Sequence, residues 1–237
     1  MKQYEIFIIG TGATGSNLLP SLAQYTMEQP IIKSITLIDG DIVEPKNARN
    51  QKFTKKDFGK NKAEVLAQRF SRLGINISYI NKYITDANDL IDLFDPSVTP
   101  IVISCVDNNN ARIILNDLFN KVDSILYFDV GNGDNTERLG QLVIGFKENK
   151  KIISPPVCDY FPQILEGDKP EPIQFSCAEQ VIENPQCIAV NSYSANIVFG
   201  SLVNLLSYKK ITSTFLSFNL DTLEVKRMND TLIKIDD

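Results

Sequence analysis

The stretch YEIFIIGTGATGSN, residues 4–17, decides the fold. It begins as a mostly apolar, β-prone run, and Gly10, Gly12 and Gly15 then follow with the spacing G-x-G-x-x-G, directly before a segment compatible with a helix. Such glycines let the backbone approach an anion closely, and the helix that follows offers the free N–H groups of its N-terminus to phosphate. The stretch therefore predicts a nucleotide site at the end of the first strand.

An acidic residue downstream supports this prediction. The second predicted strand, residues 34–38, ends at Asp39, where an acidic side chain of a βαβ unit meets a ribose hydroxyl. The pair of signals favours a bound nucleotide over a glycine turn without a ligand, but it does not say which nucleotide is bound.

The remaining elements are predicted from hydrophobic periodicity. Further strands are expected over residues 75–83, 101–105, 125–130 and 139–146, and helices over 16–25, 61–73, 87–94 and 108–119. This alternation predicts an α/β fold with a doubly wound, mostly parallel sheet in a single domain, 1–237. The proline-rich residues 148–188 show no periodicity and are predicted to be a long crossover loop. An apolar helix over 189–206 and a closing hairpin over 214–227 complete the chain.

Composition narrows the class of protein. The chain has 237 residues, a net charge of −5 and a hydrophobic fraction of 43%, as expected of a globular protein whose function does not require nucleic acid. No apolar run is long enough to cross a bilayer, and a strand begins too close to residue 1 to leave room for a signal peptide. We therefore expect a cytoplasmic protein without a membrane partner.

Histidine is absent, which excludes His-based triads, dyads and metal sites. The four cysteines form no C-x-x-C pair, so neither a four-cysteine zinc site nor a disulfide framework is expected. Any chemistry must use carboxylates, amines, thiols, backbone groups or a bound cofactor.

Three strand ends, at Gly10, Asp39 and Cys105, are predicted to meet at the switch point of the sheet, where ligands of such sheets bind. Asp107 follows the third strand and is a candidate Mg²⁺ ligand beside a triphosphate. The alternative is that Asp107 caps the helix starting near Asn108, and both roles stay open.

Two cations are candidates for triphosphate contact, Arg49 and Lys62. Lys62 lies at a predicted helix start, where a lysine is electrostatically unfavourable, and this favours an anion partner. The alternative for both is a solvated surface charge.

Together these residues resemble a known family. Residues 10–16, 39–47, 59–63 and 104–108 are similar, in order and spacing, to the motifs of the ThiF/MoeB/HesA family of ubiquitin-activating-enzyme-like adenylyltransferases. The similarity covers roughly the first 145 residues well, and residues 175–179 with the following helix resemble the family's crossover segment. It implies a Rossmann-like fold.

The resemblance also implies the roles of individual residues. Asp39 would hold the ribose of ATP, and Asp41 belongs to the same nucleotide-binding motif. The phosphates would be bound by the loop of Gly10, Gly12 and Gly15, and their oxygens would be contacted by Asn47 and Lys62. Asp107 would bind the Mg²⁺. A substrate carboxylate would attack the α-phosphate and yield an acyl-adenylate and pyrophosphate. The usual substrate is the C-terminal glycine of a ubiquitin-like or sulfur-carrier-like protein, with a conjugating acceptor downstream in some members. Family members usually form homodimers.

The sequence departs from the family pattern in three places. The usual Asn-x-x-Arg-Gln reads Asn-Ala-Arg-Asn-Gln over residues 47–51, which places Arg49 one position early. The N-terminal helix that sends an arginine into a partner's site is missing, and so are the paired zinc cysteines of the bacterial sulfur-carrier enzymes. For Arg49 to reach the γ-phosphate, as the resemblance implies for the family's arginine, the loop must adjust by one position.

Cys177 is a candidate catalytic thiol, because a cysteine on a crossover loop near a helix N-terminus can accept an acyl group as a thioester. The alternative is a cysteine packed at the base of that helix, and no positive charge closely flanks Cys177. Cys158 and Cys187 are weaker candidates, and Cys105 is expected to be a core residue.

Two other functions remain open at this point. An NAD-dependent oxidoreductase would share the glycine motif and Asp39, but it would not need Asn47, Lys62 or Asp107, and it would lack an acid–base histidine. A non-catalytic relative acting as an interaction module would bind ATP without exchanging pyrophosphate.

Overall fold

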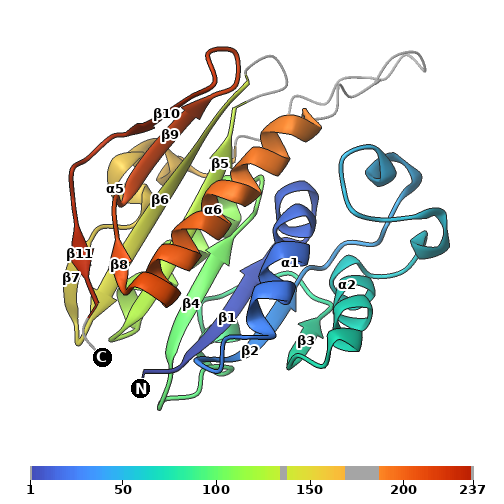
Figure 1. Cartoon of the computed structure of the whole chain (residues 1–237), viewed down its shortest axis with the longest axis horizontal. Coiled ribbons are helices and arrows are strands. Elements are labelled where there is room, and N and C mark those ends of the chain that lie inside the picture. The colour runs from blue at the N-terminus through green and yellow to red at the C-terminus, as the bar shows by residue number, and fades with distance from the viewer. Residues whose placement is uncertain (1, 134–137, 169–186, 236–237) are drawn as a thin grey trace.

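The computed structural model describes residues 2–133, 138–168 and 187–235. Its centre is a nine-stranded sheet with the order β10-β9-β6-β5-β4-β1-β2-β3, and β7 pairs with β6 (Figure 1). The strands of this sheet are β1 (Tyr4–Ile9), β2 (Ile32–Ile38), β3 (Ile77–Ile80), β4 (Thr99–Ser104), β5 (Ile125–Asn132), β6 (Leu139–Glu148), β7 (Lys151–Ser154), β9 (Phe215–Asn219) and β10 (Glu224–Arg227). A separate two-stranded sheet joins β8 (Lys210–Ile211) to β11 (Ile233–Lys234).

The sheet has a parallel and an antiparallel half. Strands β1 to β5 run parallel to one another, whereas β6 pairs antiparallel with β5, β7 and β9, and β10 pairs antiparallel with β9. The predicted α/β class and the closing hairpin, formed by β9 and β10, are therefore confirmed. The parallel half is the part that positions the candidate site, because the carboxyl ends of its strands open at one edge.

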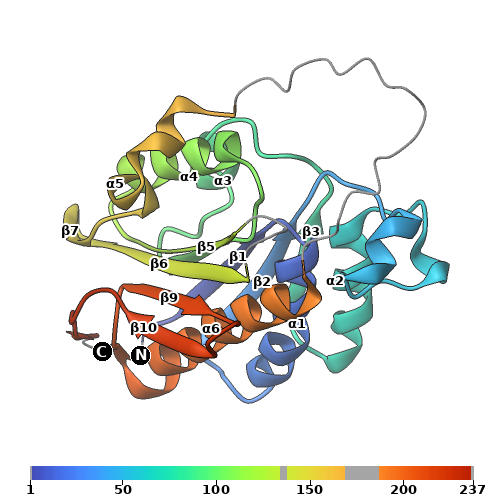
Figure 2. The same cartoon turned by 90° about the horizontal axis from the view of Figure 1, so that it is seen from above.

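Helices cover both faces of the parallel half (Figure 2). The helices are α1 (Ala13–Thr26), α2 (Lys62–Phe70), α3 (Asn88–Ile91), α4 (Asn109–Lys121), α5 (Val157–Tyr160) and α6 (Ile188–Tyr208). Strand β1 shows how the two layers arise, because successive side chains of a strand point to opposite faces. Ile6 and Ile8 pack in the core with α1, α2 and α6, whereas Phe7 and Ile9 pack with α3, α4 and α5. This alternation explains why the strand reads as one continuous apolar run.

The prediction of a featureless loop over residues 148–188 was wrong for its first part. Strand β7, helix α5 and a 3₁₀ helix (Pro162–Glu166) lie there, and residues 169–186 lie outside the described residues. These elements are only four or five residues long, too short to show a period, and tertiary packing of Val157, Cys158 and Ile164 in the core stabilises them.

Two boundaries differ in ways that matter for the site. Helix α1 starts at Ala13 rather than at residue 16, so its first turn includes Gly15. Strand β3 ends at Ile80 rather than at residue 83, because it is an edge strand paired only with β2 over four residues. The chain leaves the sheet after Ile80, and Tyr83 then lies beside Asp41, which follows the carboxyl end of β2. Within the described residues, no helix combines the length and apolar character of a bilayer-spanning segment.

Candidate functional site

The carboxyl ends of β1, β2, β4 and β5 open into a cavity of about 1000 Å³. The structure brings most of the predicted site residues together in its walls. These residues are Gly10, Gly12, Asp39, Asp41, Asn47, Arg49, Lys62 and Asp107. Gly15 is buried beneath the glycine loop, and Cys177 lies outside the described residues.

The glycine loop is shaped by two close backbone approaches. Gly10 has a φ of +87°, and a Cβ on it would lie 2.8 Å from the carbonyl oxygen of Cys105. A Cβ on Gly15 would lie 2.2 Å from the carbonyl oxygen of Gly10, well inside van der Waals contact. Only glycine fits at these two positions, so the motif reflects how tightly the first strand, the first helix and β4 pack.

Helices α1 and α4 both begin at the cavity, and they differ in how their first N–H groups are satisfied. At α4, Asn108 accepts from the N–H of Ala111 at 2.8 Å, and the carboxylate of Asp168 accepts from those of Asn109 and Asn110 at 2.9 and 3.0 Å. At α1, no side chain of a described residue caps the helix, and its first turn contains no acidic residue. The first N–H groups of α1 are therefore the groups at this cavity that we expect to bind an anion.

Asp39 lies beside the glycine loop on the neighbouring strand. Its carboxylate accepts from the N–H of Thr11 at 2.7 Å, the hydroxyl of Thr11 at 2.9 Å and the N–H of Asp41 at 2.8 Å. A carboxylate has about four acceptor positions, so Asp39 is held in place and keeps capacity for a ligand hydroxyl.

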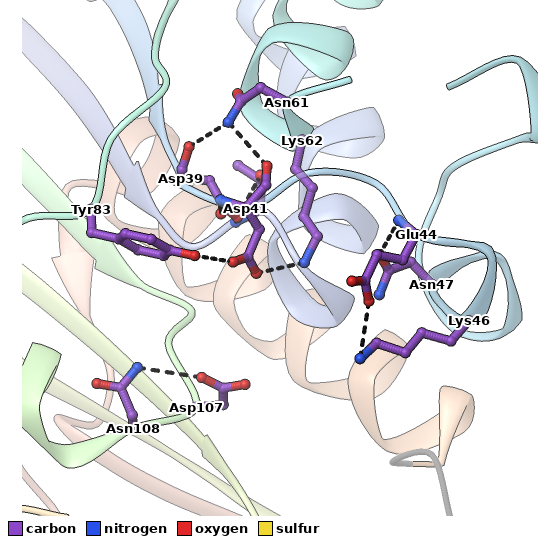
Figure 3. Close-up of polar contacts among 11 residues, drawn as sticks. Asp39, Asp41, Glu44, Lys46, Asn47, Asn61, Lys62, Tyr83, Asp107 and Asn108 are labelled. Carbon is purple, nitrogen blue, oxygen red and sulfur yellow. Dashed lines mark hydrogen bonds and ion pairs between the residues drawn. The ribbon is translucent and has the colours of Figure 1, made fainter. Parts of the chain in front are cut away.

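Lys62, Asp41 and Tyr83 form a linked group on one side of the cavity (Figure 3). Lys62 is only 6% exposed, which rules out a solvated surface charge, and its Nζ lies 2.8 Å from Oδ2 of Asp41. The hydroxyl of Tyr83 donates to the other oxygen of Asp41. The position of Lys62 at a helix start predicts an anionic partner, and in the structure that partner is Asp41 of the same chain. Contact between Lys62 and a phosphate stays a prediction.

The electrostatics of this group follow from those bonds. Burial raises the pKa of Asp41, but the hydrogen bonds from Lys62 and Tyr83 outweigh it, and the pKa lies below its ordinary value. The hydrogen bond to Asp41 is the main cause that raises the pKa of Tyr83 to about 12. Tyr83 was not predicted as a site residue. The sequence gives no sign of this role, which follows from a contact between distant residues: the ring of Tyr83 occupies the space that a Cβ on Gly40 would fill.

Asn47 and Arg49 come from a 3₁₀ helix (Pro45–Arg49) that borders the cavity. The buried side chain of Asn47 accepts from the N–H of Glu44 at 2.7 Å, which fixes it in place. Arg49 is exposed and makes no hydrogen bond or ion pair with any described residue. Its charge is therefore available to an anion in the cavity.

Asp107 is exposed at the cavity wall, and within residues 2–133, 138–168 and 187–235 its carboxylate makes one weak contact, 3.4 Å from Nδ2 of Asn108. The capping alternative is wrong, because Asn108 caps α4. No group of three or more metal-ligating side chains occurs among the described residues. One carboxylate fits Mg²⁺ that arrives with a nucleotide, since this ion usually takes one or two carboxylates together with phosphate oxygens and waters.

The three described cysteines differ in acidity. Burial raises the pKa of Cys105 to about 12 and that of Cys158 to about 11. Cys187 precedes α6, and the N–H groups of Val190 and Ala189 lower its pKa. Cys105, predicted to be a core residue, packs against the core and also borders the cavity.

Known structures share this fold. PaaA superposes with a TM-score of 0.66 at 18% identity, over 98% of this chain and 64% of that one. E. coli MccB in a complex with ATP gives a TM-score of 0.62, also at 18% identity and with the same coverage of 98% and 64%. At this level of identity the similarity establishes the fold.

Curated sequences are more similar over shorter stretches. The NEDD8-activating enzyme E1 catalytic subunit of Dictyostelium discoideum is 28% identical over 206 residues, which are 84% of this chain and 43% of that protein. The ubiquitin-activating enzyme E1 1 of Candida albicans (strain WO-1) is 28% identical over 114 residues, 46% of this chain and 11% of that protein. The chain therefore spans less than half the length of these relatives. The model of the ThiF family matches residues 1–231, and the chain belongs to the ThiF family.

Proposed function

We propose that this protein catalyses the ATP-dependent adenylation of a carboxylate, with residues 1–237 acting as one ThiF-type adenylation domain. The observation that carries this proposal is the arrangement around one cavity of an uncapped helix N-terminus, a buried lysine and an exposed aspartate. These are the groups that a magnesium-bound triphosphate needs.

The described residues suggest how ATP would be held. Asp39 would accept from a ribose hydroxyl, and the loop of Gly10 and Gly12 with the N-terminus of α1 would bind phosphate oxygens. Lys62 and Asn47 would contact further phosphate oxygens, and Arg49 the distal phosphate. Asp107 would hold the Mg²⁺. Lys62 would then be shared between a phosphate and Asp41, whose carboxylate orients it.

The chemistry requires positioning and charge stabilisation. An oxygen of the substrate carboxylate attacks the α-phosphorus, a new P–O bond forms, and the bond to the bridging oxygen breaks so that pyrophosphate leaves. A carboxylate is already deprotonated at neutral pH, so no general base is needed, and this agrees with a chain that has no histidine. The lysine, the arginine and the metal would stabilise the charge that develops on the phosphate oxygens.

The substrate proposed is the C-terminal glycine of a ubiquitin-like or sulfur-carrier-like protein. Two relatives named for activating ubiquitin and NEDD8 support this choice, and MccB has been crystallised with MccA. A downstream conjugating acceptor, a homodimer and a cytoplasmic location complete the proposal, and they rest on the resemblance to the family and on composition.

An exchange assay tests the proposal. Incubation with ATP, Mg²⁺, labelled pyrophosphate and a candidate carrier protein ending in glycine is expected to form labelled ATP only when the carrier is present. ATP binding without exchange across a panel of such carriers would favour a non-catalytic interaction module. Reduction of NAD⁺ by the same protein would overturn the proposal in favour of an oxidoreductase.

Cys177→Ala tests the thioester that we propose as a second step. The variant is expected to keep pyrophosphate exchange and to lose any carrier conjugate that a thiol reductant cleaves, because only the thiolate can accept the acyl group from the adenylate. Cys187→Ala is the matched control, since Cys187 is the described thiol with a lowered pKa. A conjugate that persists in Cys177→Ala but disappears in Cys187→Ala would assign the step to Cys187.

A further inference from the structure

A buried ion pair that sequence reasoning did not identify lies at the cavity wall, and its cation, Arg112, is one of the lining residues. Nε of Arg112 lies 3.2 Å from both carboxylate oxygens of Asp129, and the hydroxyl of Tyr127 donates to the same carboxylate at 3.0 Å. The side chain of Arg112 is 12% exposed and that of Asp129 is 1% exposed. Separating such a pair would leave a buried charge uncompensated, which is costly. The guanidinium of Arg112 is therefore held in place by Asp129.

Arg112 uses its remaining bonds to hold two strand ends. Its Nη2 donates to the carbonyl oxygen of Val106 at 3.0 Å and to that of Val130 at 3.3 Å. Val106 follows β4 and directly precedes Asp107, whereas Val130 belongs to β5. The planar guanidinium therefore links the end of β4 to β5 at the residue before the candidate metal ligand.

Asp107 itself has little to hold it. Among the described residues its carboxylate contacts only Asn108, at 3.4 Å, so its position is set by the backbone on either side. On one side Arg112 holds the carbonyl of Val106, and on the other Asn108 is fixed as the cap of α4 through the N–H of Ala111. Both flanks are tied, and the carboxylate between them is left free for a ligand.

We infer that Arg112 is a positioning residue that places Asp107 for Mg²⁺, an inference that rests on the proposed function. Mg²⁺ demands near-ideal octahedral geometry, so a small displacement of its protein ligand weakens binding. Lysine at this position would keep the positive charge but would lose the planar fork that reaches Asp129 and two carbonyls at once. The inference concerns geometry and not charge, and Arg112→Lys separates the two.

The experiment measures ATP affinity by calorimetry, with Mg²⁺ and with EDTA, and the Mg²⁺ concentration that half-saturates pyrophosphate exchange. For Arg112→Lys we expect unchanged ATP affinity in EDTA and a rise of about 10-fold or more in half-saturating Mg²⁺, the usual effect of removing an outer-shell partner. The exchange rate at saturating Mg²⁺ should change much less than the half-saturating concentration.

Lys147→Met is the matched control. Lys147 is also a buried cation that bonds two backbone carbonyls of the α4 segment, Phe119 at 3.2 Å and Asn120 at 2.8 Å, but at the end of the helix away from the cavity. This variant should lose stability without a change in Mg²⁺ dependence. In the background of Asp107→Ala, Arg112→Lys should have no further effect on the response of ATP affinity to Mg²⁺, because no ligand remains to be positioned.

The outcomes separate the inference from the proposed function. Wild-type protein that neither binds ATP nor exchanges pyrophosphate with any carrier would refute the proposed function. Wild-type activity with an unchanged Mg²⁺ response in Arg112→Lys would overturn the inference alone. If circular dichroism shows that Arg112→Lys does not fold, Asp129→Asn decides: a raised half-saturating Mg²⁺ concentration supports the inference, and an unchanged one overturns it.

Discussion

Asp107→Ala is expected to lower Mg²⁺-dependent ATP–pyrophosphate exchange by at least about 100-fold, roughly 2.7 kcal/mol in transition-state stabilisation. The fold should be unaffected, because the side chain is exposed and makes a single contact, of 3.4 Å, with the part of the chain that the structure describes. ATP affinity in EDTA should also be close to that of the wild type, since the role proposed for Asp107 is to bind the metal and not the nucleotide. Exchange kinetics, calorimetry with and without Mg²⁺, and thermal unfolding check the three expectations.

Asp117→Ala is the control for this variant. Asp117 is an acid on α4, the helix that follows Asp107, and it pairs with Lys121 at 2.7 Å outside the cavity. Its loss should therefore cost less than about 1 kcal/mol of stability and leave exchange unchanged. Exchange that is undiminished in Asp107→Ala would remove Asp107 from the site. A loss of exchange activity of the same size in both variants would mean that the rate depends on the integrity of α4 and not on the carboxylate of Asp107.

The parallel half of the fold could be predicted because its signals are local. The run that ends at Gly10, the strand that ends at Asp39 and the strand before Cys105 each show the apolar pattern of a buried strand, and adjacent parallel strands align their carboxyl ends. The convergence of Gly10, Asp39 and Asp107 on one cavity follows from that alignment, and the structure bears it out.

What the sequence could not predict depends on contacts between distant residues. The bond from Arg112 to Asp129 spans 17 positions, and the pair of Lys62 with Asp41 spans 21, so no periodicity reports either. In the sequence Arg112 resembles an ordinary charged helix residue, and only its burial at the cavity wall points to the positioning role inferred above. Asp168 likewise lies 59 positions from Asn109, and its carboxylate accepts a hydrogen bond from the N–H of Asn109.

The choice between Asp107 and Asn108 as the helix cap shows a different limit. Both residue types are good N-caps, and a shift of one residue in the helix start exchanges their roles. In the structure Asn108 has the extended backbone of a cap, and its side chain accepts from Ala111. That one-residue boundary leaves Asp107 free for a ligand, and helix boundaries are the least reliable part of a sequence-based prediction.

Gly15→Ala is expected to damage both the fold and nucleotide binding. A Cβ at this position would lie 2.2 Å from the carbonyl oxygen of Gly10, and both partners are backbone, so α1 must move away from the glycine loop. Overpacking of this kind costs about 1–3 kcal/mol, and for a domain of this size each kcal/mol lowers the melting temperature by about 2–4 °C. ATP affinity should fall by about 10-fold or more, because the same movement displaces the N–H groups at the start of α1.

Gly200→Ala provides the comparison, since Gly200 lies inside α6 and a Cβ there would meet no atom within 4 Å. Alanine is the better helix former by about 0.5–1 kcal/mol, so this variant should melt slightly higher and bind ATP normally. Thermal unfolding and calorimetry on the two variants separate a tight backbone approach from a general intolerance of glycine replacement. Wild-type ATP affinity in Gly15→Ala would mean that the close packing of α1 against Gly10 does not hold the anion site in place.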